Sequence, residues 1–275
     1  MTHRDPLLMA GQPNDQVKAN WGELGFRLGD KGTHTSRTIM LDELSILLRA
    51  CPGKAGRAEY VRALVDENCL GKQTLSTRRL TFQRLSELYA LDSAVPVFRL
   101  LRTFWRSDDK GHPQLALLAA LARDPLLRAT APVVLSMSEG EEIARQRLTD
   151  AVRQAVDDRL NEATLDKVVR NTASSWTQSG HLEGRNRKKR MKIEPTPGAG
   201  AFALVLGYML GARGRTLFDT LFARVLDRDE GALTFVAMDA RRLGFLDIKS
   251  AGGLTVVSVD SILTEQEKRL IHGAH

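Results

Sequence analysis

The sequence predicts a mainly α-helical fold, with a multi-helical core and winged-helix-like modules that carry short β-hairpins. Two observations carry this prediction. Apolar residues recur at helical spacing through most of the chain, which is typical of helices with one buried face. In addition, near residues 181–194 and 245–259, a helical pattern ends at a glycine and is followed by two short segments that can pair as strands.

Length and charge restrict the class of protein. A chain of 275 residues is long enough for one large domain or two small ones with ordinary hydrophobic cores. It contains 40 Lys and Arg against 33 Asp and Glu, which gives a net charge of +7. This excess of positive charge favours a polyanionic partner over an acidic small molecule.

Cysteine usage and hydropathy indicate the compartment. Cys51 and Cys69 are the only cysteines, and their spacing fits no metal-binding motif. Such sparse cysteines are typical of a reducing cytosol, so we expect two free thiols. No apolar run is long enough to span a membrane, and the beginning of the sequence lacks a signal pattern. We therefore expect a cytoplasmic protein with no membrane partner.

The chain divides into three expected parts. Residues 1–35 open with a stretch rich in Pro, Asn, Asp and Gln and are expected to form a flexible N-terminal arm. Residues 36–135 are expected to form an N-terminal helical domain, and residues 136–275 a C-terminal helical domain with both hairpins. In the N-terminal domain, apolar periodicity predicts helices over residues 36–51, 55–68, 75–89, 95–106, 114–122 and 125–135.

The helix expected over residues 75–89 is a candidate recognition helix of a helix-turn-helix. A hydroxyl cap near its start precedes three cations, Arg78, Arg79 and Arg84. Because the N-terminal end of a helix already attracts phosphate, these arginines are placed to contact a nucleic-acid backbone. The alternative is a surface helix whose arginines only interact with solvent.

The C-terminal domain is expected to begin with a long amphipathic helix. Ser138 and Glu141 have the spacing of a capping box, and apolar periodicity continues to Val156. Further helices are predicted over residues 198–210, 217–226 and 232–243. The last of these leads into the hairpin near 245–259, whose surroundings contain few cations: Arg241, Arg242 and Lys249. We therefore expect this second module to serve packing or protein interaction.

The first module is the stronger candidate for function. A helix is expected over residues 165–179, ended by Gly180, with strands over 181–183 and 191–194 around a basic loop. The polar side chains of this helix include groups able to reach base edges: Lys167, Arg170, Asn171, Ser174, Ser175 and Gln178. The loop and second strand offer cations for phosphate contacts: Arg185, Arg187, Lys188, Lys189, Arg190 and Lys192.

Phosphate contacts of this kind predict binding to double-stranded DNA that weakens as salt rises. Three alternatives stay open. The basic run is a solvated surface loop, or it docks on an acidic partner in a protein-interaction scaffold, or the chain binds RNA. The last has less support, because the Trp and Tyr residues do not alternate with the basic residues as a base-stacking surface requires.

Motifs for catalysis, cofactors and metals are missing from the sequence. There is no phosphate-binding GxxxxGK[ST] run, and the pair Gly198 and Gly200 lacks the third glycine and the βαβ context of a dinucleotide loop. The histidines are scattered without metal-ligand spacing. We therefore expect a protein that is not an enzyme, with no cofactor and no metal.

The order of several segments resembles the BrxA family, the small helical accessory proteins of BREX phage-defence systems. The resemblance covers roughly residues 36–210 and rests on spaced Leu, Arg and Gly positions in residues 36–37, 68–79, 84–85, 115–127 and 164–182. It implies a non-enzymatic, cytoplasmic protein that binds double-stranded DNA and works alongside a DNA methyltransferase and ATPases. It implies no particular DNA-reading residues. Residues 1–35 and those after Gly211 extend beyond it.

Overall fold

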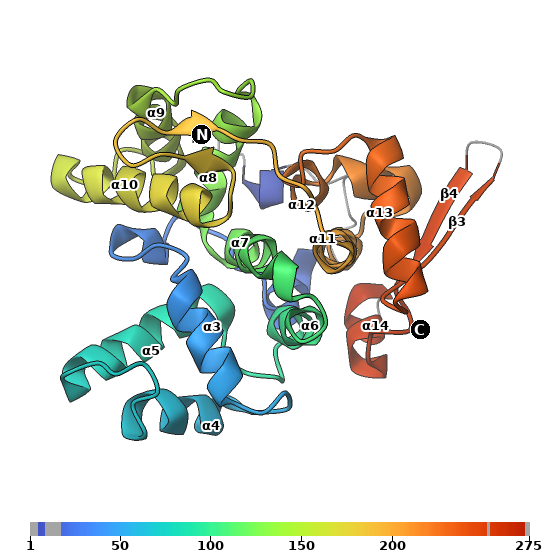
Figure 1. The fold of residues 1–275 in the computed structure, drawn as a ribbon, viewed down its shortest axis with the longest axis horizontal. Helices are drawn as coiled ribbons and strands as arrows, with labels where there is room; N and C mark the ends of the chain where they lie inside the picture. The colour runs from blue at the N-terminus through green and yellow to red at the C-terminus, as the bar shows by residue number, and fades with distance from the viewer. Residues whose placement is uncertain (1–4, 9–17, 252–253, 273–275) are drawn as a thin grey trace.

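The computed structural model describes residues 5–8, 18–251 and 254–272. This part of the chain is mainly helical, and its strands form two small antiparallel sheets of two strands each. The prediction of a mainly α-helical, multi-helical fold with two short hairpins is therefore confirmed. Figure 1 shows three groups of helices arranged around a central set.

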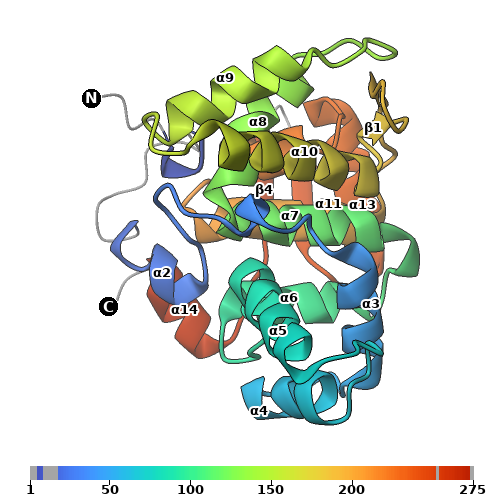
Figure 2. The same ribbon diagram turned by 90° about the vertical axis from the view of Figure 1, so that its left-hand side faces the viewer.

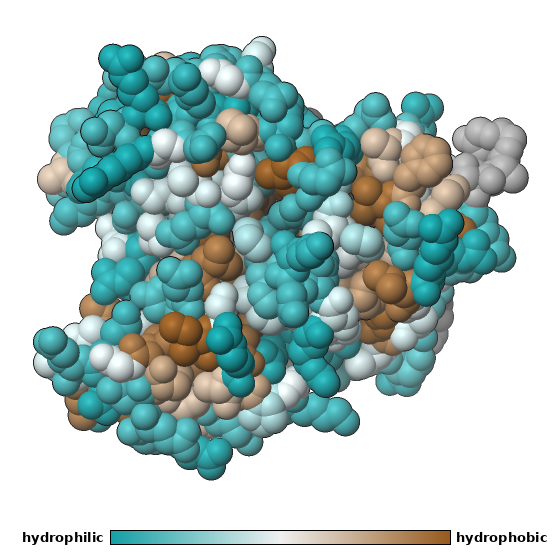
Figure 3. All heavy atoms as spheres, in the orientation of Figure 1, coloured by the Kyte–Doolittle hydropathy of each residue, from teal (hydrophilic) through white to brown (hydrophobic). Residues whose placement is uncertain are grey.

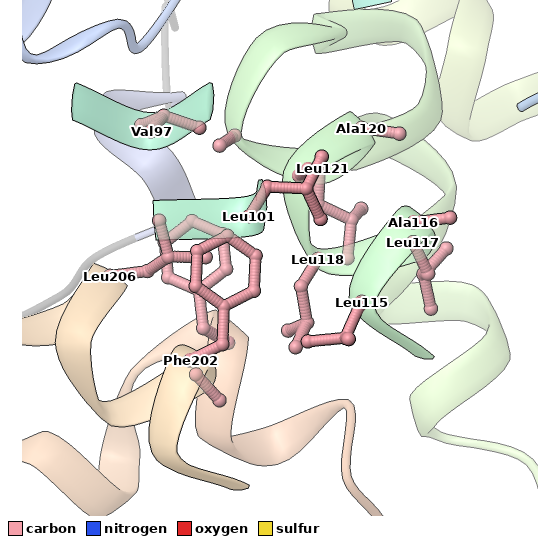
Figure 4. Packing of buried hydrophobic residues seen from close by; sticks show 14 of the residues in the cluster. Val97, Leu101, Leu115, Ala116, Leu117, Leu118, Ala120, Leu121, Phe202 and Leu206 are labelled. Carbon is pink, nitrogen blue, oxygen red and sulfur yellow. The ribbon is translucent and has the colours of Figure 1, made fainter. Parts of the chain in front are cut away.

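The central set consists of three helices that are buried along most of their length: α6 (Pro96–Trp105), α7 (His112–Arg123) and α11 (Pro197–Met209). Every residue from Gln114 to Ala122 in α7 is buried, as is every residue from Gly198 to Met209 in α11. Helices of this kind need other helices on all sides. Figure 4 shows how leucine and alanine side chains of α7 meet Leu101 of α6 and Phe202 and Leu206 of α11.

One group of helices precedes the central set in the sequence: α3 (Leu41–Ala50), α4 (Arg57–Val61), a π-helical turn η3 (Arg62–Asp66) and α5 (Leu75–Tyr89). Thr74 caps α5, because its Oγ1 accepts a hydrogen bond from the backbone N–H of Thr77 at 3.2 Å. Helix α5 packs against η3 and α7. The candidate helix-turn-helix segment thus ends in a helix with an exposed N-terminal turn.

The second group contains α8 (Pro125–Leu135), α9 (Arg145–Ala155) and α10 (Glu162–Gln178), followed by the first hairpin, β1 (Leu182–Glu183) and β2 (Lys189–Arg190). Helix α10 contacts α8, α9 and the 3-10 turn η2 (Thr33–Thr35). Figure 2 shows the segment that leads into α3 running alongside α10.

The third group closes the chain. It contains a 3-10 turn η5 (Gly214–Asp219), α12 (Leu221–Arg224), α13 (Glu230–Arg242), the second hairpin of β3 (Asp247–Ala251) and β4 (Leu254–Ser258), and α14 (Glu265–His272). In the second hairpin, Asp247 pairs with Ser258 and Ile248 with Val257. Ile248 and Val257 are buried, and α13 packs against β3. One face of this helix–hairpin unit therefore packs against the protein, while the far end of the hairpin extends away from the helices (Figure 1).

Much of the expected flexible arm belongs to the core, which corrects that expectation. The described part of residues 1–35 contains the turn η1 (Pro6–Leu8) and helix α2 (Trp21–Leu24). Leu7, Trp21 and His34 are all at most 2% exposed. The apolar side chains are too few for a helical period, yet Leu7, Trp21, Leu24 and Phe26 belong to the core. Residues 1–4 and 9–17 lie outside the described part.

Two expected helix starts are also wrong. The helix expected from Ser36 begins at Leu41, because Met40 has a left-handed backbone (φ 52°) that a helix cannot include. The helix expected from Ser138 begins at Arg145. Ser138 does donate its backbone N–H to Glu141 at 2.8 Å, as in a capping box, but no helix follows at once. Across the expected domain boundary at 135/136, the buried apolar residues form one continuous cluster.

Candidate nucleic-acid interface

The first hairpin is shorter than expected and its register differs. Leu182 pairs with Arg190 and Glu183 with Lys189, so β2 precedes the strand expected over 191–194. Gly184 allows the tight turn, since its φ is +107° and a Cβ there would lie 2.2 Å from the carbonyl oxygen of Arg187. The basic residues are therefore held on a narrow hairpin.

An acidic segment, residues 138–144, lines the free edge of β2; we refer to it as the edge segment. Gly140 donates its N–H to Arg190 O at 2.8 Å, Arg190 donates to Glu141 O at 2.9 Å, and Ile143 donates to Lys188 O at 2.8 Å. The hairpin is thus a three-stranded ribbon in its backbone hydrogen bonding. This segment contributes three carboxylates beside the basic loop: Glu139, Glu141 and Glu142.

Sequence reasoning missed this acidic edge because Ser138 and Glu141 were assigned to a helix start. The available signal was charge complementarity: an acidic run lies before α9 and a basic run lies after α10. Residues of opposite charge that face each other across neighbouring strands stabilise the pairing of those strands. The edge segment also lowers the net positive charge of the hairpin.

Arg190 is buried, which corrects the expectation that the whole basic run is an exposed loop. Its side chain is 0% exposed and forms an ion pair with Asp227, which is 2% exposed. Its Nε donates to the carbonyl oxygen of Val134 at 2.9 Å. Its Nη1 also donates to the carbonyl oxygens of His181 and Met191, so this buried guanidinium has no donor left in position for DNA. Arg190 holds the hairpin on the body of the protein.

The other cations of this run differ in how free they are. Arg185 and Lys189 are exposed, and Arg187 is 83% exposed with a 3.9 Å contact to Glu142. Lys188 is half-buried, and its Nζ donates to Thr177 Oγ1 at 2.8 Å. Burial lowers the pKa of Lys188. Three cations, Arg185, Arg187 and Lys189, are therefore presented to solvent at the end of the hairpin, and we call them the hairpin cations.

Lys192 lies at the base of the hairpin. Its Nζ is 3.4 Å from the same Asp227 carboxylate that binds Arg190, and its side chain is 38% exposed. Two cations thus share one buried carboxylate. Lys192 is therefore less available to a phosphate than the hairpin cations are.

Three of the polar side chains expected on the DNA-reading face of α10 bind the neighbouring chain instead. Asn171 donates from Nδ2 to His34 O at 2.8 Å, and Ser175 Oγ accepts the N–H of Ile39 at 2.9 Å. Gln178 donates from Nε2 to Thr38 Oγ1 at 3.0 Å. These side chains fasten the segment that follows η2 to α10, so this face of the helix is covered.

The remaining α10 candidates are more accessible. Lys167 is exposed, Arg170 is exposed and paired with Asp166 at 3.1 Å, and Ser174 is half-buried. A recognition helix needs one continuous face of free polar groups in the major groove. In α10 the segment of residues 34–41 covers Asn171 and Gln178 and so interrupts that face. The helix therefore does not offer the continuous polar face that a recognition helix places in the major groove.

The arginines of α5 are divided between structural and free positions. Arg78 donates from Nη1 to Val65 O at 3.1 Å, which ties α5 to η3. Arg84 binds Glu87 at 2.8 Å on the same helix. Arg79 is exposed, and among the described residues it has no hydrogen-bonding or ionic partner. Of these three expected phosphate contacts, Arg79 alone is both solvent-facing and unpaired.

A buried network joins His34, Asp124 and Ser175. The Nδ1 atom of His34 lies 2.9 Å from Asp124 Oδ2, and its Nε2 lies 2.8 Å from Ser175 Oγ. Burial alone would raise the pKa of Asp124, but the charge of His34 and hydrogen bonds outweigh it and lower the pKa. The order of groups matches a Ser-His-Asp triad, whose three residues come from distant parts of the sequence.

The surroundings of this network are those of a structural clamp. His34, Asp124 and Ser175 are each at most 1% exposed, and none of them lines either described cavity. Ser175 Oγ also lies 2.8 Å from Asn171 O and accepts the N–H of Ile39. A nucleophile needs space for a substrate within reach of its oxygen. Here neighbouring backbone occupies that space.

His181, at the foot of the hairpin, is 0% exposed. Its Nδ1 lies 2.9 Å from Ser179 Oγ and its Nε2 lies 2.7 Å from Val225 O. Burial lowers the pKa of His181 from 6.5 to about 4, so the imidazole is neutral at pH 7. It therefore adds no positive charge to the hairpin.

The surface over this region is polar. In Figure 3, hydrophilic side chains cover most of the area over α9, α10 and the first hairpin, while hydrophobic residues gather in small separate patches. Within the described residues, no group of His, Cys, Asp and Glu is placed to hold a metal ion. The described helices include none that is long and apolar enough to cross a membrane. Comparison of the sequence with protein-family models and with curated proteins finds no match.

Proposed function

We propose that the chain is a non-enzymatic accessory protein that binds double-stranded DNA through the hairpin cations. The main support is that Arg185, Arg187 and Lys189 are all exposed on one short hairpin, with only a 3.9 Å carboxylate contact to Arg187. Phosphate binding by such cations releases counterions and supplies affinity that is independent of base sequence.

The placement of α10 supports backbone contact over base reading. Since Asn171 and Gln178 are engaged with residues 34–41, few amide groups remain to recognise base edges. Arg79 at the exposed start of α5 is a second candidate phosphate contact. The proposed complex is therefore one of low sequence specificity.

Double-stranded DNA is preferred over single strands because no stacking surface accompanies the cations. The three Trp and three Tyr residues are all buried, at most 7% exposed. Binding of single-stranded DNA or RNA usually depends on aromatic side chains that stack on bases. RNA binding is the weaker alternative for this reason.

The cellular setting of the proposal rests on the resemblance to BrxA over residues 36–210. On that basis we place the protein in the cytoplasm, in a BREX phage-defence system with a DNA methyltransferase and ATPases as partners. The absence of an open nucleophile around Ser175 supports the non-enzymatic part of the proposal.

A mobility-shift series with duplex DNA, single-stranded DNA and RNA of the same sequence tests this function. We expect a duplex shift that is lost as salt rises, with weaker shifts for the single strands. A shift that is equally strong at low and high salt, or no duplex shift at all, contradicts the proposal.

A protein-interaction scaffold is the second candidate, and exposed apolar side chains on α13 favour it. Phe235 is 70% exposed and Met238 is 37% exposed, one helical turn apart, with Leu243 58% exposed just beyond the helix. Capture of other defence-system proteins that survives nuclease treatment, and that is lost on Phe235→Ser substitution, would favour this candidate.

A further inference from the structure

A second concentration of positive charge lies in a cavity of about 310 Å³. Its walls come from the ends of α3 and α6 and the start of α7, and they include Arg49, Arg102 and Arg106. Asp109 is the one acidic residue among those that line it; its carboxylate is 93% exposed and lies 3.6 Å from His112. The cavity wall therefore carries an excess of positive charge.

Arg102 forms the fixed part of this wall. It is 4% exposed, and it donates from Nη1 to Leu48 O at 2.7 Å and from Nη2 to Cys51 O at 2.9 Å. These carbonyls lie at the end of α3, where helix carbonyls lack partners within the helix. The Nε of Arg102 is buried without a hydrogen-bond acceptor. This guanidinium therefore adds a fixed positive charge to the cavity wall.

Arg49 and Arg106 form the accessible part. Both are exposed, and within the described residues neither has an ion-pair or hydrogen-bond partner for its guanidinium. Arg106 lies against Gly53, where a Cβ would be 2.6 Å from Nη1 of the arginine. Because Gly53 has no side chain, the guanidinium of Arg106 can lie against it at the cavity.

Helix dipoles offset only part of this charge. Helices α3 and α6 both end at the cavity, and each C-terminus carries roughly half a negative charge. The positive charge of Arg102, which binds carbonyls at the end of α3, already balances the combined negative charge of these two helix ends. Arg49 and Arg106 add two further positive charges to the lining of the same cavity.

We infer that this cavity binds the phosphate group of a small phosphorylated ligand. A phosphate offers several acceptor oxygens at once, which suits the planar forks of two arginines. The volume is at the lower end of the range for small-molecule sites, so it has room for more than a bare ion. This inference does not rest on duplex binding by the hairpin cations.

Isothermal titration calorimetry with inorganic phosphate and with adenosine monophosphate tests the inference on the full chain. The test variant is Arg49→Gln with Arg106→Gln, and the matched control is Arg241→Gln with Arg242→Gln, which lie outside both the cavity and the hairpin cations. We expect the wild type and the control to bind at least one probe equally well, and the test variant to bind at least about tenfold more weakly. Arg49→Gln alone serves as a second variant if the double variant is misfolded by circular dichroism.

A duplex titration of the same variants identifies the source of the phosphate. If the test variant loses probe binding and keeps duplex affinity, the site takes a small phosphorylated molecule. If it loses both, the site takes a phosphate of the DNA backbone as well. Absence of heat with both probes in the wild type, or equal probe affinity in the wild type and the test variant, would overturn the inference.

Discussion

Arg190 and Asp227 form an ion pair that is almost completely shielded from solvent, with the two side chains 0% and 2% exposed. Asp227 follows α12, and Arg190 lies in β2, so the pair fastens the hairpin to the third group of helices. It places one of the cations in the basic run in a structural role. Substitution of a structural cation such as Arg190 should change the stability of the protein, whereas substitution of an exposed hairpin cation should change its affinity for DNA.

Substitution of Arg190 by Gln should lower the stability of the protein. The carboxylate of Asp227 would stay buried with only Lys192 and the N–H of Ile193 as partners. Breaking a buried ion pair on one side costs about 3 to 5 kcal/mol. Urea denaturation measures the loss. The control is Arg185→Gln, an exposed position expected to change the free energy of unfolding by less than about 0.5 kcal/mol. Full stability with lost DNA affinity in Arg190→Gln would contradict the structural role.

Substitutions in α10 also distinguish an effect on protein stability from an effect on DNA affinity. Asn171→Ala and Gln178→Ala each remove a hydrogen bond to residues 34–41, which should cost about 1 kcal/mol of stability. Duplex affinity should not change, because these groups are not free to reach DNA. Denaturation and fluorescence anisotropy with labelled duplex measure the two effects. If either variant keeps wild-type stability and loses duplex affinity, α10 reads DNA after all.

The buried imidazole of His181 makes stability depend on pH. Because its folded-state pKa is about 4 and its ordinary value is 6.5, the unfolded chain takes up this proton first as pH falls. The stabilising contribution is complete above pH 6.5 and is lost as pH falls towards 4, by about 3 kcal/mol in total.

Urea denaturation at pH 7 and pH 5 measures this loss. The variant His181→Gln should be less stable at pH 7, since the contacts to Ser179 and Val225 change. It should also lose less stability between the two pH values than the wild type does. Equal losses in both proteins would show that His181 is not the group responsible.

The acidic edge segment should weaken DNA binding. Glu139 and Glu142 are exposed beside the hairpin cations, and each would repel a phosphate backbone. Replacing both by Gln should raise duplex affinity several-fold at low salt, and less at high salt because exposed charges are screened. Anisotropy titrations at two salt concentrations measure this. Unchanged affinity would mean that DNA does not approach this side of the hairpin.

The fold class and several helices could be predicted because their patterns are local. The helix expected over residues 75–89 agrees with α5, although the hydroxyl that caps it belongs to Thr74, just before the expected range. Helical periodicity and a terminal Gly180 were likewise enough to predict α10 and the turn after it. These features depend on neighbouring residues alone.

The rest of the candidate site could not be predicted because it depends on contacts between distant segments. Nothing near Arg190 in the sequence indicates its pairing with Asp227, and nothing near Ser175 indicates His34 and Asp124. The same holds for the edge segment, whose pairing with β2 replaced the expected helix start at Ser138. Polar residues on a helix face look alike in sequence whether they bind DNA or another part of the chain.

The most direct test is the salt dependence of duplex binding after charge reversal of Arg185, Arg187 and Lys189 to Glu. The matched control reverses Arg241, Arg242 and Lys249 beside the second hairpin, two of which are already paired with carboxylates at 2.8 and 2.7 Å. Reversal of the hairpin cations should weaken binding strongly and lower the salt slope by about one unit for each lost phosphate contact. The control should retain most of the affinity and the full slope. Equal losses in the two variants, with both still folded by circular dichroism, would show that the first hairpin is not the DNA-binding surface.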